Sequence, residues 1–550
     1  MTELLLSITD LHIAARSEQG GLQEIVNGVS LRLEHGTVLG LIGESGAGKS
    51  TVGLAALGYT RHGCRLLSGS IRLNGEELFG APYEKLRQIR GARVTYVAQS
   101  AAAAFDPAHR LEDQIIESAV VHGILSPEEA RREARRLYEK LRLPDPDNFG
   151  RRYPHQVSGG QLQRAMTVMA MVPKPDLVVF DEPTTALDVT TQIEVLAAIK
   201  AAIRDERLAA IYITHDLALV AQIADRILVL KDGRMVEEGA TEDILKRPTQ
   251  PYTRALVQVR RVHKPSAPQP AAQEPLLEVR GVDAAYGAVP VLEDIWLRLC
   301  RGRTTAVVGE SGSGKSTLAR VITGLLPPRR GEVRLLGEPL PPGLRQRNRD
   351  QLRRIQLVYQ MPDVALNPRH KVEEIIGRPL SFYFGLGAEA RRRRVEELLR
   401  AVELAPEFAD RYPGELSGGQ KQRVCIARAL AAEPDVIICD EVTSALDVQV
   451  ADAVLRLLLD LQAATGVAYL FITHDLATVR AIADDIVVML DGRIVEQGTR
   501  EDILTPPHHP YTDLLLSSVP EMEVGWLDRI LAERAARKAR GERIMEAADR

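Results

Sequence analysis

The sequence predicts an α/β fold with two similar domains in tandem, each built around a mainly parallel sheet. A phosphate-binding pattern, G-x-x-x-x-G-K-[ST], occurs at residues 43–50 and again at 309–316. Continuous apolar runs at 177–180 and 209–214 have the composition of strands buried on both faces, and helical segments alternate with them. Strands that alternate with helices after a phosphate loop indicate a parallel sheet covered by helices.

The second half of the chain repeats the first. Lys49 recurs as Lys315, an offset of 315 − 49 = 266 residues. Four later residues each recur 259 positions further on, and they are Ser158 (as Ser417), Asp181 (as Asp440), His215 (as His474) and Tyr252 (as Tyr511). A duplicated domain with drifted loops gives this pattern. We expect a first domain at 1–259, a proline-rich linker at 260–275, a second domain at 276–525 and a helical tail at 526–550.

The composition is that of an ordinary globular protein of 550 residues, with 45% hydrophobic and 26% charged residues. The formal net charge of −4 gives no reason to expect nucleic acid as a partner. No uncharged apolar run approaches the roughly 18 residues of a spanning helix, and the N-terminus lacks the basic region of a signal peptide. The four cysteines form no C-x-x-C pair and no metal spacing, which indicates reduced thiols in a cytosol.

Each phosphate loop follows an apolar run and precedes a helix-compatible segment, as a nucleotide-binding loop must. Its glycines let backbone N–H groups surround phosphates at the N-terminus of the helix, its lysine neutralises phosphate charge, and the following Ser coordinates Mg²⁺. A chance glycine-rich turn would not recur. The expected binding residues are Gly43, Ser45, Gly46, Gly48, Lys49, Ser50 and Thr51 in the first copy and Gly309, Ser311, Gly312, Gly314, Lys315, Ser316 and Thr317 in the second.

A pair of carboxylates ends a buried strand in each copy, Asp181-Glu182 after 177–180 and Asp440-Glu441 after 436–439. The carboxyl ends of parallel strands form the edge at which α/β sheets bind ligands. The Asp is suited to hold Mg²⁺ through water, and the Glu to orient or deprotonate the attacking water. Two adjacent acids can also form a solvated turn, but the same pair after the same kind of strand favours catalysis.

A Ser-Gly-Gly-Gln sequence precedes a helix in each copy. Its serine caps the helix, and its glycines let backbone donors approach an anion. These loops resemble the signature sequence of ATP-binding cassette (ABC) ATPases, and the resemblance covers most of the chain. Leu416 gives the second copy the full Leu-Ser-Gly-Gly-Gln form, whereas the first begins with Val157. The residues concerned are Ser158, Gly159, Gly160 and Gln161, and Ser417, Gly418, Gly419 and Gln420.

The resemblance implies two cassettes that bind and hydrolyse ATP with Mg²⁺, each with a phosphate-loop core, a small antiparallel β part and a helical subdomain. In this family two cassettes close face to face, and each nucleotide is shared with the signature loop of the other cassette. Gln99 and Gln360 match the Q-loop glutamine, which senses the metal and faces the membrane subunit. His215 and His474 match the switch histidine, and Asp188 and Asp447 match the D-loop. The implied metal site comprises Ser50, Gln99 and Asp181, with Ser316, Gln360 and Asp440 in the second copy.

The segments 248–253 and 507–512 narrow the type of transporter. They are similar to the His-Pro-Tyr-Thr segment of ATPases from oligopeptide, dipeptide, nickel and opine importers, and Phe105-Asp106-Pro107 and Leu366-Asn367-Pro368 fit the same subfamily. The resemblance implies two separate membrane-spanning permease subunits, an extracytoplasmic solute-binding protein and a peripheral position on the cytoplasmic face of the inner membrane. Some members carry a cysteine cluster after this segment. No cysteine follows Cys439, so we expect no iron–sulfur cluster.

Other tandem cassette proteins remain alternatives. Soluble ones that act on ribosomes or nucleic acid carry a long charged helical linker, whereas this linker is short and proline-rich. DNA-repair cassettes carry inserted zinc-binding cysteines, which this chain lacks. Exporters usually fuse cassettes to their own spanning helices. The sequence therefore favours the import ATPase.

The two ATP sites are expected to differ in how they hold adenine. Cassettes of this family usually stack the base on an aromatic residue shortly before the phosphate loop, and Tyr286 occupies that place in the second copy. Alignment of the first strands puts Ala15 opposite Tyr286, and no Phe, Tyr or Trp precedes Tyr59. The alternative is that backbone and apolar neighbours cover the adenine of the first site equally well.

Overall fold

The computed structural model describes residues 3–16, 21–184, 187–258, 264, 274–444 and 446–540. These residues form two compact units. The described part of the first unit comprises residues up to 258 together with 520–540, and that of the second lies between 264 and 519. Residues 520–540 therefore belong to the first unit, although they follow the second unit in the sequence.

The core of the first unit is a six-stranded sheet in the order β10-β9-β3-β8-β7-β6, in which β10 alone is antiparallel to its neighbour. Its central strands are entirely buried because helices and a second sheet cover both faces. The strands are β3 (Val38–Ile42), β6 (Val94–Val97), β7 (Leu177–Asp181), β8 (Ala209–Ile213), β9 (Arg226–Lys231) and β10 (Arg234–Ala240).

An antiparallel sheet in the order β2-β1-β4-β5 packs against this core. Its strands β1 and β2 are long, with 13 residues each. Their pairing shifts register at several points, which breaks the simple alternation of apolar and polar residues. The strands are β1 (Leu4–Arg16), β2 (Leu22–Glu34), β4 (Cys64–Leu73) and β5 (Glu76–Glu77).

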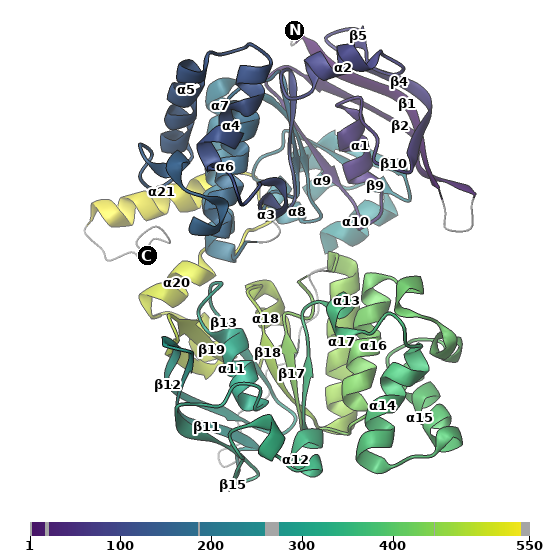
Figure 1. The fold of residues 1–550 in the computed structure, drawn as a ribbon, viewed down its shortest axis with the longest axis vertical. Helices are drawn as coiled ribbons and strands as arrows, with labels where there is room; N and C mark the ends of the chain where they lie inside the picture. Colours follow the sequence, from purple (N-terminus) through teal and green to yellow (C-terminus); the bar gives the residue numbers. More distant parts are fainter. Residues whose placement is uncertain are drawn as a thin grey trace. The chain divides into compact units, whose positions relative to one another are not determined.

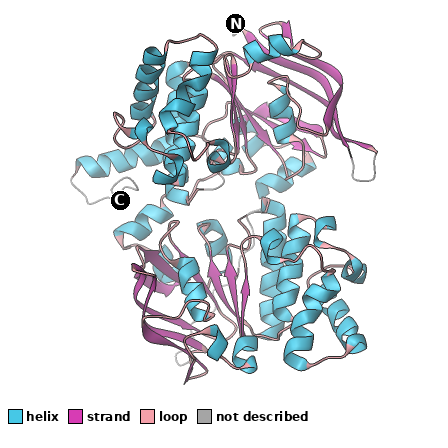
Figure 2. Ribbon diagram, viewed as in Figure 1, coloured by secondary structure: helices cyan, strands magenta, loops and turns pink. Residues whose placement is uncertain are grey.

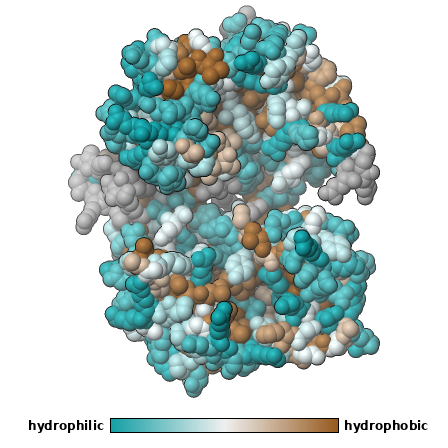
Figure 3. Space-filling model, in the orientation of Figure 1, coloured by the Kyte–Doolittle hydropathy of each residue, from teal (hydrophilic) through white to brown (hydrophobic). Residues whose placement is uncertain are grey.

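The helical part of the first unit lies on the other side of the parallel sheet (Figures 1 and 2). The helices of the unit are α1 (Lys49–Ala55), α2 (Tyr83–Ile89), α3 (Ala101–Ala104), α4 (Leu111–Val121), α5 (Pro127–Lys140), α6 (Gly159–Met171), α7 (Val189–Glu206), α8 (Leu217–Val220), α9 (Thr241–Lys246), α10 (Pro251–Gln258) and α21 (Trp526–Ala539), with 3₁₀ turns η1 (Phe149–Arg151) and η2 (Pro154–Gln156). Ser126 and Glu129 form a capping box that starts α5. The arginines of α5 are exposed, and the surface around this helix is mostly hydrophilic in Figure 3.

The second unit repeats this architecture. Its sheets have the orders β12-β11-β14-β15 and β16-β17-β18-β13-β19-β20. The strands are β11 (Leu277–Tyr286), β12 (Val289–Leu299), β13 (Thr304–Val308), β14 (Arg330–Leu335), β15 (Glu338–Pro339), β16 (Ile355–Val358), β17 (Val436–Asp440), β18 (Ala468–Ile472), β19 (Asp485–Leu490) and β20 (Arg493–Thr499). The helices are α11 (Lys315–Ile322), α12 (Arg349–Arg354), α13 (Pro362–Ala365), α14 (Val372–Phe384), α15 (Ala388–Ala401), α16 (Gly418–Leu430), α17 (Val448–Thr465), α18 (Leu476–Ile482), α19 (Arg500–Leu504) and α20 (Pro510–Leu516), with 3₁₀ turns η3 (Leu344–Gln346), η4 (Pro406–Asp410) and η5 (Pro413–Glu415).

Each unit thus has the predicted mainly parallel core, small antiparallel sheet and helical part, which confirms the fold class. Within the described ranges, no helix combines the length and the apolar character needed to cross a bilayer.

Candidate functional site

The phosphate loops join the central strand of each parallel sheet to the helix that follows it, β3 to α1 and β13 to α11. Gly48 and Gly314 cap these helices at φ 93° and 101°, a conformation that glycine adopts without strain. A Cβ at Gly43 or Gly309 would lie 2.2 Å from a backbone oxygen of β9 or β19. The close turn therefore needs glycine at the predicted positions, and the lysine, serine and threonine that follow form the first turn of the helix.

The loop lysines are buried beneath the loops that contain them. Lys49 Nζ donates to the carbonyl oxygens of Gly43 and Glu44 at 2.7 and 2.8 Å. Lys315 Nζ makes the same two bonds to its own loop, at 2.8 and 2.6 Å. The ammonium group is thus held at the centre of the loop, where phosphate oxygens enter a site of this kind.

The strand-end aspartates face the serines of the phosphate loops. Ser50 Oγ donates to Asp181 Oδ1 at 2.9 Å, and Ser316 Oγ donates to Asp440 Oδ1 at 3.1 Å. Burial raises the pKa of Asp440, and the neighbouring charge of Glu441 adds to the rise. Each serine–aspartate pair brings together two hard oxygen ligands that lie 131 or 124 positions apart in the sequence.

Glu182 accepts hydrogen bonds from the other motifs of the first unit. Gln99 Nε2 donates to Glu182 Oε2 at 3.0 Å, and His215 Nδ1 lies 3.1 Å from Glu182 Oε1. The backbone of Glu182 is left-handed at φ 49°, a conformation that a non-glycine residue rarely adopts. Strained backbone of this kind persists only where the surrounding structure stabilises it, and it is found most often at functional sites.

The second unit repeats the cluster around Glu441, whose backbone is left-handed at φ 51°. Gln360 Nε2 donates to Glu441 Oε2 at 2.6 Å, and His474 Nδ1 lies 3.4 Å from Glu441 Oε1. Burial would raise the pKa of Glu441, but the bond and charge of His474 lower it. Burial would likewise lower the pKa of His474, and its bond to Glu441 raises it instead. Each member of the pair therefore stabilises the charged form of the other.

Tyr96 is a site residue that the sequence analysis missed. Its hydroxyl donates to Asp181 Oδ2 at 2.5 Å, so both carboxylate oxygens of Asp181 are bonded. Burial, followed by this bond, raises the pKa of Tyr96. Tyr96 lies three residues before Gln99 (99 − 96 = 3), and the residue three before Gln360 is Leu357. The surroundings of the two strand-end aspartates therefore differ, which a comparison of the two copies could have revealed.

The tyrosine of the Pro-Tyr-Thr segment reaches the phosphate loop in the second unit. Tyr511 is buried, and its hydroxyl accepts the backbone N–H of Glu310 at 2.8 Å. In the first unit the ring of Tyr252 lies 4.8 Å from Lys231 Nζ. The sequence identified this segment as a mark of transporter type, and the structure shows that in the second unit it also braces the nucleotide loop.

The signature sequences 158–161 and 417–420 form the N-termini of α6 and α16, in the helical part of each unit. Each is a reciprocal capping box between its serine and its glutamine, with bonds of 3.3 Å in both directions in the first unit and 3.3 and 2.9 Å in the second. The serine and first glycine of each sequence are exposed. These helix ends therefore offer backbone N–H groups to an anion at the surface of the unit.

The D-loop aspartates are also helix caps. Asp188 Oδ1 accepts the N–H of Thr191 at 3.0 Å and starts α7, and Asp447 Oδ1 accepts the N–H of Val450 at 3.0 Å and starts α17. A Cβ on the second glycine of each signature would lie only 2.3 Å from the side chain of Thr191 or 2.4 Å from that of Val450. Each signature helix thus packs closely against the helix that its D-loop begins.

The strand register places Ala15 where the second unit has Tyr286. Ala15 pairs with Gln23 and Tyr286 pairs with Val289. Gln23 and Val289 stand at the same distance from their phosphate-loop lysines, because 49 − 23 and 315 − 289 are both 26. The structural equivalence that the sequence alignment assumed therefore holds.

Arg320 lies beside the ring of Tyr286, and the first unit has no arginine at the equivalent position. Tyr286 is 42% exposed, and Arg320 Nη1 donates to its hydroxyl at 2.8 Å. Arg320 lies five residues after Lys315, and the equivalent residue of the first unit is Leu54 (320 − 266 = 54). The two sites differ in two side chains beside the expected adenine position.

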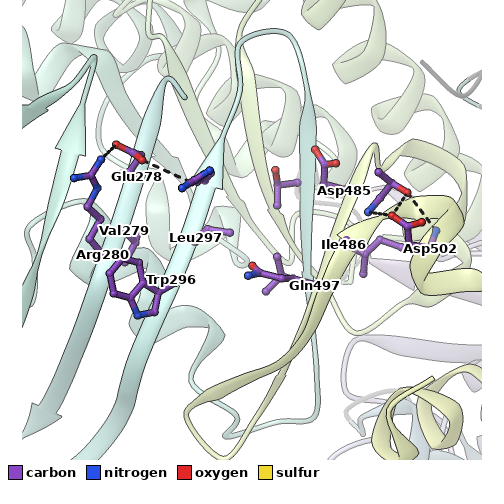
Figure 4. A pocket seen from close by; sticks show the side chains of 14 residues that line it. Glu278, Val279, Arg280, Trp296, Leu297, Asp485, Ile486, Gln497 and Asp502 are labelled. Atoms are coloured by element: carbon purple, nitrogen blue, oxygen red, sulfur yellow. Dashed lines mark hydrogen bonds and ion pairs between the residues drawn. The ribbon is translucent and has the colours of Figure 1, made fainter. Parts of the chain in front are cut away.

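The second unit also contains a pocket of about 520 Å³ (Figure 4). Two of its carboxylates are paired, Glu278 with Arg280 at 2.7 Å and Asp485 with Arg303 at 2.8 Å. The lining residues are Glu278, Val279, Arg280, Trp296, Leu297, Arg298, Thr305, Asp485, Ile486, Val487, Gln497, Gly498, Thr499 and Asp502. None of the predicted site residues lines it.

Comparison with protein families gives two kinds of match. A family described as "ABC transporter" matches residues 26–185 and 292–444. A family described as "Oligopeptide/dipeptide transporter, C-terminal region" matches residues 236–280 and 495–542. The first confirms the resemblance drawn from the phosphate loops and signatures, and the second confirms the subfamily drawn from the Pro-Tyr-Thr segments.

Similar proteins match over nearly the whole chain. The "Glutathione import ATP-binding protein GsiA" of Salmonella choleraesuis (strain SC-B67) is 40% identical over 559 residues, which cover 94% of this chain and 89% of that protein. The protein of the same name from Escherichia coli O6:H1 (strain CFT073) is 38% identical over 565 residues, which cover 94% and 90%. Among solved structures, cbiO1 from Clostridium perfringens, part of the ABC transporter complex cbiONQ, matches with a TM-score of 0.39 and 29% identity over 42% of this chain and 91% of that chain.

Proposed function

The chain belongs to the ATP-binding subunits of ABC importers of the oligopeptide and dipeptide type, and from this premise we propose which residues perform its chemistry and what it transports. The observation that carries the proposal is the bonded cluster of glutamate, glutamine and histidine beside each phosphate loop. Three motifs that lie far apart in the sequence meet there in each unit, and the aspartate beside the glutamate bonds to the fourth, the phosphate loop.

The glutamates Glu182 and Glu441 are the general bases for the attacking water in this proposal. Each lies next to the aspartate that faces the phosphate-loop serine, and each already accepts bonds from a glutamine and a histidine through its carboxylate. A carboxylate held in this way can orient water and accept its proton. The histidine, which faces the same carboxylate, is placed to contact the γ-phosphate, and the lysine neutralises charge on the phosphates.

The residues beside each phosphate loop fit Mg²⁺. In the first unit the Ser50 hydroxyl and the Asp181 carboxylate meet at 2.9 Å, and in the second the Ser316 hydroxyl and the Asp440 carboxylate meet at 3.1 Å. Mg²⁺ prefers oxygen ligands and keeps several waters, so one hydroxyl and one carboxylate suffice when phosphates supply the rest. When bound, the ion would neutralise charge on the transferred phosphoryl group. The bonds of Gln99 and Gln360 place those side chains beside the same strand ends.

Replacement of Tyr96 by Phe is expected to weaken Mg²⁺-dependent ATP binding at the first site, because Asp181 loses a bond that holds it in position. The change removes one charge-assisted bond to Asp181 Oδ2, which is worth about 1.5–3 kcal/mol in a buried setting. We expect the Mg²⁺ concentration needed for half-maximal ATP binding to rise by roughly tenfold at the Lys49 site. Magnesium titration of ATP binding in a Lys315→Ala background measures this effect.

The matched control for Tyr96→Phe is Leu357→Phe in a Lys49→Ala background, because Leu357 stands at the equivalent position in the second unit. That change is expected to leave the Mg²⁺ concentration for half-maximal ATP binding at the Lys315 site unchanged. An unchanged titration of Tyr96→Phe would show that the hydroxyl does not position Asp181.

The proposed partners are two membrane-spanning permease subunits and an extracytoplasmic solute-binding protein, with this chain on the cytoplasmic face of the inner membrane. The match to the oligopeptide/dipeptide transporter region supports this assignment. The relatives' names indicate a cargo of glutathione or a related short peptide. We propose that class of cargo for this transporter.

Co-purification tests the proposed assembly. A tagged chain isolated from detergent-solubilised membranes is expected to carry two membrane-spanning proteins, and mass spectrometry identifies them. The ribosomal fraction of the same cells is the control, because the alternative class of tandem cassette ATPases acts on ribosomes or nucleic acid. Recovery with ribosomes and without membrane proteins would contradict the proposed assembly.

A further inference from the structure

The segment that follows the Pro-Tyr-Thr helix α20 of the second copy packs into the first unit. Trp526 and Leu527, at the start of α21, are 2% and 0% exposed and belong to the main hydrophobic cluster of the first unit. Met522, Ile530 and Leu531 are partly buried against the same cluster. Figure 1 shows α21, in yellow, beside helices of the first unit. Burial of this kind is that of a core element and not of a loose tail.

One buried side chain of the first unit fixes the position of this segment. Gln222 is 2% exposed, and its Nε2 donates to the carbonyl oxygens of Glu521 and Glu523 at 2.9 and 3.0 Å. Its Oε1 accepts the N–H of Leu527 at 3.0 Å. The side-chain amide of Gln222 has its donor group on one side and its acceptor on the other. These three bonds to backbone groups therefore fix the register of the segment against the first unit.

In the first copy, Lys264 follows the Pro-Tyr-Thr helix and is bound by the second unit. Lys264 donates its N–H to the carbonyl oxygen of Ala481 at 2.8 Å, and its Nζ donates to Asp484 Oδ2 and Gln462 Oε1, both at 2.6 Å. The Asp484 side chain is almost fully buried, so its charge needs this partner. Arg500 also donates to the carbonyl oxygen of Lys264, at 3.0 Å.

Lys264 and Glu523, which lies within 521–531, occupy equivalent positions in the two copies. Lys264 follows Tyr252 by 12 residues, and Glu523 follows Tyr511 by 12 residues. The offset between Lys264 and Glu523 is 523 − 264 = 259, the same as for the motifs of the cassettes.

The two docking places are also copies of one another. Ala481 stands 259 residues after Gln222, and both lie seven residues after the switch histidine of their unit (222 − 215 and 481 − 474). Residues 521–531 of the second copy and Lys264 of the first copy therefore bind equivalent places, each in the other cassette. Exchange of equivalent elements of this kind is the pattern of domain swapping.

We propose that residues 521–531 and Lys264 form a reciprocal clasp that keeps the two cassettes associated when no nucleotide is bound. Each cassette is then connected to the other by its own extension as well as by the linker. Two linked contacts reinforce each other, because the second forms at the high effective concentration set by the first. The inference concerns the assembly of this chain and does not depend on the proposed cargo.

Cleavage of the linker tests the clasp in the full-length protein. A protease site inserted between residues 266 and 272 allows the purified chain to be cut into its two halves, and each half keeps its own docking segment. In the absence of ATP and Mg²⁺, the halves are expected to sediment together at the mass of the intact chain, 60.5 kDa. Separation of the wild-type halves, or association only when ATP is added, would overturn the proposal.

Substitutions in the clasp are expected to separate the cut halves. Trp526→Ala removes a buried aromatic side chain and is expected to weaken their association at least 100-fold, equivalent to about 2.8 kcal/mol. Gln222→Ala removes the three bonds to the segment and is expected to weaken it at least tenfold. Asp528→Asn is the matched control, because it removes only the exposed ion pair with Lys200 and is expected to change the affinity less than fivefold. Clasp variants that bind as tightly as wild type would overturn the proposal.

Hydrogen exchange in the uncut chain supplies a second measurement if a variant half fails to fold. The amide of Leu527 is bonded to Gln222 and is expected to exchange slowly without nucleotide. Gln222→Ala should make the exchange of residues 521–531 fast while the strands of the first unit stay protected. Fast exchange of this segment in the wild-type chain would overturn the proposal.

Discussion

Replacement of Glu182 and Glu441 by Gln is expected to stop ATP hydrolysis while ATP binding persists. An amide keeps the shape of the carboxylate, and its single oxygen can still accept one of the two bonds from the neighbouring glutamine and histidine, but it cannot take a proton from water. Loss of a general base lowers rates by roughly 10²–10⁴, or about 3–5 kcal/mol of barrier. Steady-state phosphate release and equilibrium nucleotide binding, measured on the same preparation, separate the two effects.

The control for this double variant is Glu139→Gln, which changes an exposed residue of α5. Its turnover is expected to match that of the wild type. Near-normal hydrolysis in the Glu182→Gln, Glu441→Gln protein would show that the strained glutamates are not the general bases.

The two ATP sites are expected to differ in affinity by about 5- to 150-fold, with the Lys315 site tighter. Stacking of a base on an aromatic ring is worth roughly 1–3 kcal/mol in nucleic-acid complexes, and that range gives the fold-change. Tyr286 supplies a half-exposed ring with Arg320 bonded to its hydroxyl, whereas the first unit has Ala15 and Leu54 at these positions. Nucleotide titration of Lys49→Ala and Lys315→Ala variants measures each remaining site.

Three substitutions resolve the cause of that difference. Tyr286→Ala should remove most of the advantage of the second site, and Ala15→Tyr should tighten the first. Tyr286→Phe is the matched control, because it keeps the ring and loses only the bond from Arg320. Equal affinities of the two sites, unchanged by Tyr286→Ala, would contradict adenine stacking on this residue.

The features that the sequence predicted well are those whose physical cause is local. The run 177–180 is continuous and apolar because β7 is buried on both faces, and the glycines of the phosphate loops are needed where the chain turns tightly. The start of α5 is another local feature, because its capping box of Ser126 and Glu129 lies within four residues. The strands β1 and β2 were harder to predict, because register shifts interrupt their alternation.

The features that the sequence could not predict depend on contacts between distant residues. The bond from Tyr96 to Asp181 spans 85 positions, and the bonds from Gln222 to the segment after α20 span about 300. Sequence reasoning treated the segment from 526 on as a tail because its charges alternate, but its first two residues are apolar and buried in the first unit. The repeat offset of 259 could have linked Lys264 to Glu523, but not to their docking places.

ATP-driven uptake is the measurement that tests the central claim most directly. The chain is reconstituted in lipid vesicles with its permease subunits and binding protein, and labelled glutathione and short peptides are supplied on the side of the binding protein. The account predicts that peptide accumulates only when ATP is present on the side of this chain. No accumulation is expected with the Glu182→Gln, Glu441→Gln protein. Vesicles that hydrolyse ATP and accumulate no peptide, or a double variant that transports at the wild-type rate, would contradict it.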